Sequence, residues 1–321
     1  MVWATLFLVG GLLLLWRGAD FLVNGAVGLA ERMGVSQLVA GLTIVAMGTS
    51  APEVAAAVAA AVSGKGDIAI GNVYGSNVAN LAMIGGIVAL IRPLRVRPGT
   101  LCREIPAMLV VTLLLWPFLA DLTVSRVDAA LLLLVFGALI AHVVRTARTA
   151  STTPFAEAPP ARVEPPQTVG RDVLSIAVGL VALAVGAKGA VSGAVTIGTR
   201  IGLSDAVIGS TIIAVGTSLP ELVTCLVAAA KGHHDISVGN LVGSNIFNIL
   251  FVTGVAGLVR PFSVASRFAG GADFWIVMGV SGLFAGLAII GGRTIRRKSG
   301  GVLLAVYAAY LVYLLRSAGP A

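Results

Sequence analysis

The sequence predicts an all-α, polytopic membrane protein in which ten transmembrane helices form two inverted five-helix repeats. Of the 321 residues, 57% are hydrophobic and 11% are charged, and the mean hydropathy is +0.99. A water-soluble domain could not bury that much apolar surface in one core. Apolar segments long enough to cross a hydrocarbon layer of about 30 Å, which takes ~20 helical residues, recur along almost the whole chain. A polar motif inside these segments also returns once, at a fixed distance along the sequence.

Each apolar segment is expected to be a helix, because a helix satisfies its own backbone hydrogen bonds in lipid. The first segment could be mistaken for a signal peptide, but no basic region precedes it and the residues that follow belong to the repeat. Cys102 and Cys225 lack any pairing or metal-ligand spacing, so we expect packing residues rather than a disulfide or zinc site. In order, the predicted crossings are 3–29, 37–63, 67–91, 103–120, 124–146, 171–200, 205–231, 235–259, 272–292 and 299–316.

The net charge of +8 is explained by membrane topology rather than by a nucleic-acid partner. If the N-terminus is outside, fourteen Lys and Arg residues fall on one side of the membrane and six on the other. The positive-inside rule then places both termini outside the cytoplasm, in a cell membrane that the Ala, Gly and Arg content suggests is prokaryotic. The fourteen are Arg32, Arg92, Arg95, Arg97, Arg103, Arg145, Arg148, Arg162, Arg171, Lys231, Arg293, Arg296, Arg297 and Lys298.

The repeat is marked by Gly-Thr-Ser-Ala-Pro-Glu at 48–53, which returns as Gly-Thr-Ser-Leu-Pro-Glu at 216–221, an offset of 168. Each half holds five crossings, and an odd number makes the second copy enter the membrane in the opposite orientation. We therefore expect repeats at 1–148 and 171–321, joined by a proline-rich cytoplasmic linker at 149–170. Recurring glycines are expected to serve close helix packing: Gly18, Gly25, Gly186 and Gly193.

Glu53 and Glu221 lie deep inside predicted crossings, where inserting a carboxylate costs at least ~2.5 kcal/mol, so we expect a functional pair. Each follows a proline, Pro52 or Pro220, which removes a backbone donor and predicts a kinked or unwound helix with freed carbonyls. Hydroxyl groups lie on the same turns: Thr49, Ser50, Thr217 and Ser218.

Gly-Ser-Asn-x-x-Asn follows each glutamate and places Ser76 with Asn80, and Ser244 with Asn248, on one helix face. For Asn72, Asn77, Asn240 and Asn245, ligation and hydrogen bonding between helices stay equally open. The donors are all oxygens, without a cysteine or a buried histidine. Such a site suits Ca²⁺, which takes 6–8 oxygens in flexible geometry, better than a transition metal.

At these residues the sequence resembles the cation/calcium exchanger superfamily, in particular the prokaryotic sodium/calcium exchangers. Residues 41–86 and 209–254 are similar to the two alpha repeats of that family. The resemblance implies a secondary active antiporter that exchanges Ca²⁺ for Na⁺ by alternating access. Its partners would be cations and membrane lipid, with no prosthetic group and no obligate protein partner, and it would not be an enzyme.

By the same resemblance, Glu53 and Glu221 would hold Ca²⁺ together with Thr49, Ser50, Thr217, Ser218 and the carbonyls of Ala46 and Ala214. Ser76, Asn80, Ser244 and Asn248 would complete flanking Na⁺ sites. One departure matters, because members of this family can carry an aspartate where this chain has Asn80 or Asn248. The site then offers two negative charges, which predicts an exchange near two Na⁺ per Ca²⁺, or one that uses protons.

Exchange would follow because both ions need the same glutamates, while helices 3–29 and 171–200 slide across the site. Asp20 and Lys188 occupy equivalent places in these two helices and either form an ion pair or reach toward the membrane interface. A proton/calcium antiporter, a cation channel and an intramembrane enzyme stay open as alternatives.

Overall fold

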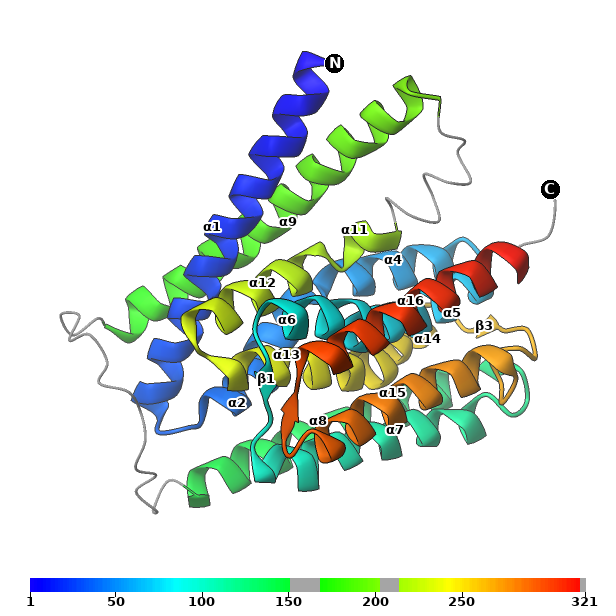
Figure 1. Cartoon of the computed structure of the whole chain (residues 1–321). Coiled ribbons are helices and arrows are strands. Elements are labelled where there is room, and N and C mark those ends of the chain that lie inside the picture. Colours follow the sequence, from blue (N-terminus) through cyan, green and yellow to red (C-terminus); the bar gives the residue numbers. More distant parts are fainter. Residues whose placement is uncertain (151–167, 203–213, 318–321) are drawn as a thin grey trace.

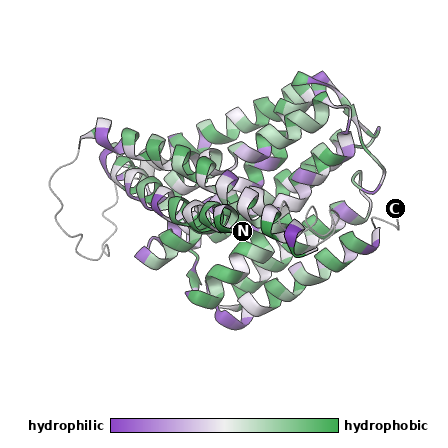
Figure 2. Ribbon diagram, turned by 90° about the horizontal axis from the view of Figure 1, so that it is seen from above, coloured by the Kyte–Doolittle hydropathy of each residue, from purple (hydrophilic) through white to green (hydrophobic). Residues whose placement is uncertain are grey.

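A computed structural model describes residues 1–150, 168–202 and 214–317 of the chain, almost all of them as helix (Figure 1). Within these residues, eight helices are long and apolar enough to cross a membrane, and a bent pair, Gln37–Thr49 with Ala51–Val62, makes a ninth. Figure 2 shows hydrophobic residues along the flanks of the helices and many hydrophilic residues near their ends, as a lipid surrounding requires. The chain is therefore a helical membrane protein.

The helices of the first half are α1 (Val2–Met33), α2 (Gln37–Ala40), α3 (Ala46–Thr49), α4 (Ala51–Val62), α5 (Gly66–Val78), α6 (Gly85–Ile91), α7 (Ile105–Phe118) and α8 (Arg126–Ala150). Those of the second half are α9 (Val169–Arg200), α11 (Ala214–Thr217), α12 (Leu219–Lys231), α13 (His234–Phe247), α14 (Thr253–Val259), α15 (Ala272–Ile290) and α16 (Arg297–Ser317). π-Helical turns join some of them: η1 (Gly41–Val45), η2 (Ala79–Ile84), η3 (Thr100–Glu104) and η5 (Asn248–Val252).

Nine of the ten predicted crossings lie in described residues and are helical there, whereas the predicted crossing at 205–231 lies partly outside them. Between the two halves, α8 ends at Ala150 and α9 begins at Val169, so the first two and last two residues of the predicted linker 149–170 are helical. Residues 151–167 of that linker lie outside the described part.

The chain is not wholly α-helical, because two short antiparallel strand pairs join its two halves. β1 (Leu94–Arg95) pairs with β4 (Thr294–Ile295), and β2 (Thr123–Val124) pairs with β3 (Phe262–Ser263). β3 is the equivalent of β1 at the offset of 168 residues. Each of these two strands pairs with a strand of the other half, so the same kind of contact is made once in each direction. Strands of two residues carry no periodicity, which is why the sequence did not predict them.

Arginine side chains also make contacts in both directions between the halves, at the ends of two helices. Arg92 donates to the carbonyls of Ala229 and Ala230 at the end of α12, at 2.8 and 2.6 Å. Its equivalent, Arg260, donates to the carbonyl of Val62 at the end of α4. A cation at a helix C-terminus satisfies orphan carbonyls and complements the helix dipole, so each half stabilises a helix of the other.

The centre of the molecule is formed by two continuous helical rods, Gly66–Ile91 and His234–Val259. Their apolar stretches are 78% buried, against 17% for α8 and α16 at the periphery. Polar side chains in the middle of these rods are therefore held away from both lipid and water: Ser76, Asn77, Asn80, Ser244, Asn245 and Asn248.

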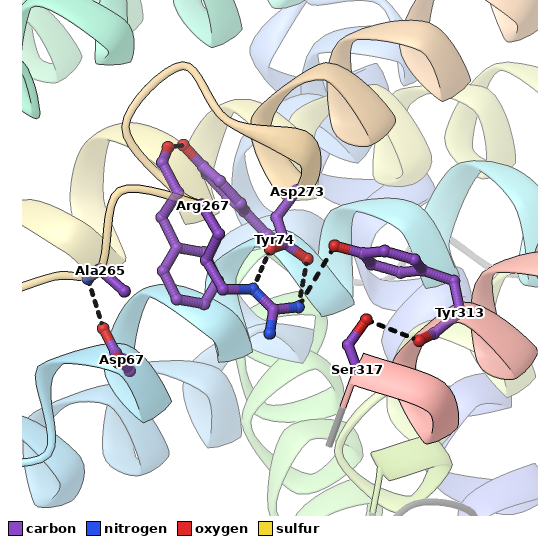
Figure 3. Close-up of polar contacts among 8 residues, drawn as sticks. Asp67, Tyr74, Ala265, Arg267, Asp273, Tyr313 and Ser317 are labelled. Atoms are coloured by element: carbon purple, nitrogen blue, oxygen red, sulfur yellow. Dashed lines mark hydrogen bonds and ion pairs between the residues drawn. The ribbon is translucent and has the colours of Figure 1, made fainter. Parts of the chain in front are cut away.

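A group of polar contacts around Arg267 fixes the loop between β3 and α15 next to α5, the first part of the Gly66–Ile91 rod (Figure 3). Arg267 donates through two nitrogens to Asp273, which is 3% exposed, and its Nη2 lies 3.5 Å from the Tyr313 hydroxyl. Tyr74 in α5 donates to the carbonyl of Phe268 at 3.0 Å, and Asp67 accepts from the backbone N–H of Ala265 at 2.7 Å. The arginine–aspartate pair thus joins the loop to the start of α15, and the Tyr74 and Asp67 contacts hold the loop against α5.

Helices α1 and α9 lie side by side as an antiparallel pair that crosses the remaining helices at a steep angle (Figure 1). Glycines line their contact, as predicted for Gly18, Gly25, Gly186 and Gly193. A Cβ on Gly18 would meet the Gly179 carbonyl at 2.9 Å, and one on Gly186 would meet the backbone N of Leu15 at 2.8 Å. Arg32 and the buried Asp172 add an ion pair of 2.5 Å, so the two helices are joined tightly to each other.

Candidate cation-binding site

The two predicted glutamates, one from each half, are both buried, each 1% exposed, at the centre of the structure. Ser50, which lies one turn before Glu53, donates to Glu221 Oε1 at 2.9 Å across the two halves. The charge of Glu221 also acts on Glu53, while the Ser76 hydroxyl lies at the Glu53 carboxylate. The fold therefore brings together carboxylates that are 168 residues apart in sequence.

The predicted break in each glutamate helix is present, and it lies at a serine two residues before the proline. Ser50, with φ −84° and ψ 11°, ends α3 and begins α4, and the two segments bend by 45°. Ser218 takes the same conformation before α12, with φ −89° and ψ 6°. Pro52 and Pro220 lie in the first turn of the helices that follow, where their missing N–H is tolerated.

The hydroxyl groups on these turns are mostly buried. Thr49, Ser50 and Ser218 are at most 1% exposed, and Thr217 is half-buried. Thr49 lies 3.0 Å from the Val45 carbonyl and 3.2 Å from Asn240 Oδ1. The Ala46 carbonyl accepts the N–H of Ser50 at 3.1 Å and lies 3.4 Å from the Thr49 hydroxyl, whereas Ala214 is the first residue of α11.

The serine and asparagine of each central rod also reach the centre. Ser76, Asn80, Ser244 and Asn248 are all buried. Asn80 lies in the π-helical turn η2, and Asn248 begins η5. π-Helical turns rearrange the backbone ladder and are frequent at functional sites, but no residue pattern in this sequence predicted them.

Five buried oxygen atoms among the predicted ligands have no hydrogen-bond partner in the part of the chain that the structure describes. They belong to both glutamates, both asparagines and one serine, and such atoms are costly to bury unless something compensates them. A hard cation would compensate all of them, so the residues fit such an ion as transported substrate. The atoms are Glu53 Oε2, Glu221 Oε2, Asn80 Oδ1, Asn248 Oδ1 and Ser218 Oγ.

The described residues contain no group of three His, Cys, Asp or Glu side chains arranged to hold a metal. Among the described residues, the predicted ligands thus include two carboxylates, and the other oxygen ligands are neutral.

Of the two alternatives left open for Asp20 and Lys188, the structure does not form the ion pair. Asp20 pairs with Lys231 at the end of α12, and Lys188 is exposed without an ion pair among the described residues. Because α1 and α9 are antiparallel and Gly18 lies against Gly179, Asp20 falls about ten residues, or ~15 Å of helix, from Lys188. Equivalent positions in an inverted pair meet only near the centre of the crossing.

The structure shows hydrogen bonds for two of the asparagines whose role the sequence left open, Asn77 and Asn240. Asn240 donates to Cys225 Sγ at 3.3 Å and accepts from Ser244 at 3.4 Å, while Asn248 donates to Asn77 Oδ1 at 3.1 Å. The duplication of Asn72 and Asn77 as Asn240 and Asn245 was the available signal, but it did not give the partners.

A model of the sodium/calcium exchanger protein family matches residues 3–145 and 172–316 of this chain. The chain is 40% identical to the putative antiporter CaxA of Alkalimonas amylolytica, over 99% of this chain and 100% of that protein. It is 32% identical to the sodium/calcium exchanger MaX1 of Methanosarcina acetivorans, over 96% and 97% of the two chains.

The fold is also similar to a solved structure. The sodium-calcium exchanger NCX_Mj, soaked with zero Na⁺ and Ca²⁺, superposes with a TM-score of 0.83 over 98% of this chain and 99% of that one, at 28% identity.

Proposed function

The chain belongs to the sodium/calcium exchanger protein family, and we propose that it exchanges Ca²⁺ for Na⁺ at the central site between its two halves. The observation that carries the proposal is the pair of buried carboxylates, Glu53 and Glu221, surrounded by oxygen atoms without partners. Such an arrangement is unfavourable when empty and favourable around a cation.

Glu53, Glu221, Thr49, Ser50, Thr217, Ser218 and the carbonyls of Ala46 and Ala214 would bind Ca²⁺. Ser76, Asn80, Ser244 and Asn248 would extend the same site for Na⁺. Because both ions require the two glutamates, one ion must leave before the other binds. This competition couples the movement of one ion to that of the other.

Alternating access would come from α1 and α9 sliding as one body past the central rods. Their glycine-lined contact and the Arg32–Asp172 ion pair support this, since they join the two helices to each other. The crossed contacts of Arg92 and Arg260 and of the short strands support two inverted repeats, 1–148 and 171–321, around a 149–170 linker. The distribution of basic residues supports placing both termini outside the cytoplasm.

The site charge favours a stoichiometry near two Na⁺ per Ca²⁺. One Ca²⁺ or two Na⁺ neutralise Glu53 and Glu221, whereas a third Na⁺ would leave a buried positive charge without compensation. Exchange should then depend little on membrane potential.

The test is ⁴⁵Ca²⁺ uptake into proteoliposomes under an imposed Na⁺ gradient, with K⁺ and pH gradients applied separately as controls. Glu53→Gln and Glu221→Gln should each reduce uptake at least 100-fold, because each removes half of the site charge while keeping the side-chain volume. Uptake driven by the pH gradient alone would assign the chain to proton/calcium exchange instead. Wild-type activity in either glutamine variant would refute the site.

A further inference from the structure

Asn77 lies beside the site but has both ends of its side chain occupied by the other half of the protein. Its Oδ1 accepts from Asn248 Nδ2 at 3.1 Å, and its Nδ2 donates to the Asn245 carbonyl at 3.4 Å. Asn77 is 1% exposed. Both polar ends of its side chain are thus held by contacts with the other half.

An asparagine ligand has two faces of opposite character, and only one of them binds a cation. The carbonyl oxygen is an acceptor, whereas the NH₂ group carries two donors and repels positive charge. Asn248 is held by its NH₂ group, which leaves its Oδ1 buried and without a partner. The contact with Asn77 therefore determines which atom of Asn248 is available to an ion.

We propose that Asn77 is a positioning residue that turns the oxygen of Asn248 toward the transported cation. The inference rests on the proposed function, since it assigns an orientation to one of the proposed ligands. Without the Asn77 acceptor, the buried NH₂ of Asn248 needs another partner, and the carboxylates at the site are the strongest acceptors available. The amide would then compete with the cation for them.

The second half of the chain provides a natural control. Asn245 is the equivalent of Asn77 at the offset of 168 and is equally buried. Its Nδ2 donates to the Leu241 carbonyl of its own helix at 2.7 Å, and it forms no hydrogen bond with Asn80. Removing the two side chains should therefore have different effects, although residue type and depth are the same.

The experiment compares the KM for Ca²⁺ and the maximal rate of Na⁺-driven ⁴⁵Ca²⁺ uptake among position-77 variants. Asn77→Leu should raise KM about tenfold, the effect of losing roughly one hydrogen bond of ~1.4 kcal/mol. Asn77→Asp keeps an acceptor for Asn248 although it loses the donor to the Asn245 carbonyl, so it should raise KM less than Asn77→Leu does. Asn245→Leu should change KM less than threefold. If Asn77→Leu cannot be purified, Asn77→Ser replaces it, because its hydroxyl is too short to reach Asn248.

A double-mutant cycle separates orientation from general packing. In Asn248→Asp both terminal atoms of the side chain are oxygens, so either orientation of the side chain offers an oxygen to the cation. Adding Asn77→Leu to this variant should therefore raise KM less than threefold. The inference would be overturned if Asn77→Leu raised KM equally in the wild-type and Asn248→Asp backgrounds. It would also be overturned if Asn77→Asp raised KM as much as Asn77→Leu. Absence of uptake in the wild-type protein would instead overturn the proposed function.

Discussion

The charge of the central site depends on two residues, Asn80 and Asn248, which place neutral oxygens where an aspartate would add a third negative charge. Both side chains are buried, and both have an oxygen without a partner. A single substitution is therefore expected to change the electrical character of transport.

Asn248→Asp should make exchange electrogenic. A third carboxylate can neutralise a third Na⁺, so each cycle would carry one net charge across the membrane. The measurement is the rate of Na⁺-driven Ca²⁺ uptake at membrane potentials set by K⁺ and valinomycin. The potential should change the rate of the variant several-fold and the rate of the wild type little. Ser63→Asp adds the same charge at an exposed position and should behave as wild type. Strong voltage dependence of the wild type would contradict the two-sodium stoichiometry.

His233 gives the protein a pH-dependent stability outside the membrane-spanning segments. Its Nδ1 lies 3.0 Å from Gln37 Oε1, and burial together with the charge of Lys231 lowers the pKa of His233. Because the folded pKa lies below the unfolded value of about 6.5, stability is complete above that pH and is lost as pH falls through it toward the folded pKa.

Thermal unfolding in detergent at pH about 7.5 and about 5.5 tests this, since the two conditions lie on either side of the ordinary histidine pKa. The wild type should melt at a lower temperature in acid, and His233→Asn should lose part of that difference. His142→Asn, at an exposed position on α8, is the control. Equal acid sensitivity of wild type and His233→Asn would exclude this histidine as the cause.

At the scale of elements, the contact between α1 and α9 depends on the absence of side chains at glycine positions. A Cβ on Gly11 would lie 2.7 Å from the Gly186 carbonyl, whereas one on Gly10, the adjacent residue, meets nothing within 4 Å. Gly11→Ala should lower the free energy of unfolding by ~1–3 kcal/mol, the range for overpacking. Gly10→Ala should be neutral or stabilising by up to ~1 kcal/mol, because alanine favours the helix. Melting temperatures in detergent provide the comparison, and equal values would show that the helices separate easily.

For the whole molecule, Lys231 connects the α1–α9 pair to the helix that carries Glu221. Its ammonium group pairs with Asp20 and donates to Asn24 Oδ1 at 2.7 Å. The offset of 168 places Ser63 opposite Lys188 in the other half, so no equivalent ion pair can form there. The connection therefore stabilises one of the two arrangements expected for an alternating-access protein.

Lys231→Met and Asp20→Asn should each change the ratio of Ca²⁺ affinities on the two membrane faces by about threefold, as expected for a partly exposed ion pair. Both variants should shift it in the same direction, because they remove the same contact. Lys65→Met, an exposed lysine beyond the end of α4, should leave the ratio unchanged. The measurement is uptake and release in oriented proteoliposomes, and opposite shifts for the two variants would argue against a shared role.

The helical membrane fold, the positions of most helices and the candidate ligands could be predicted from sequence, because hydrophobicity in lipid and an exact repeat are local signals. The sequence also located the helix breaks, since Pro52 and Pro220 remove backbone donors wherever they occur.

The contacts between residues far apart in sequence could not be predicted and became visible in the folded protein. The fold paired Asp20 with Lys231 instead of Lys188, directed Asn77 to Asn248 and formed the short strand pairs. These outcomes depend on the antiparallel crossing of helices and on the register between the two halves. A repeat shows which positions are equivalent, but equivalent positions are in contact only where they lie close to the axis that relates them.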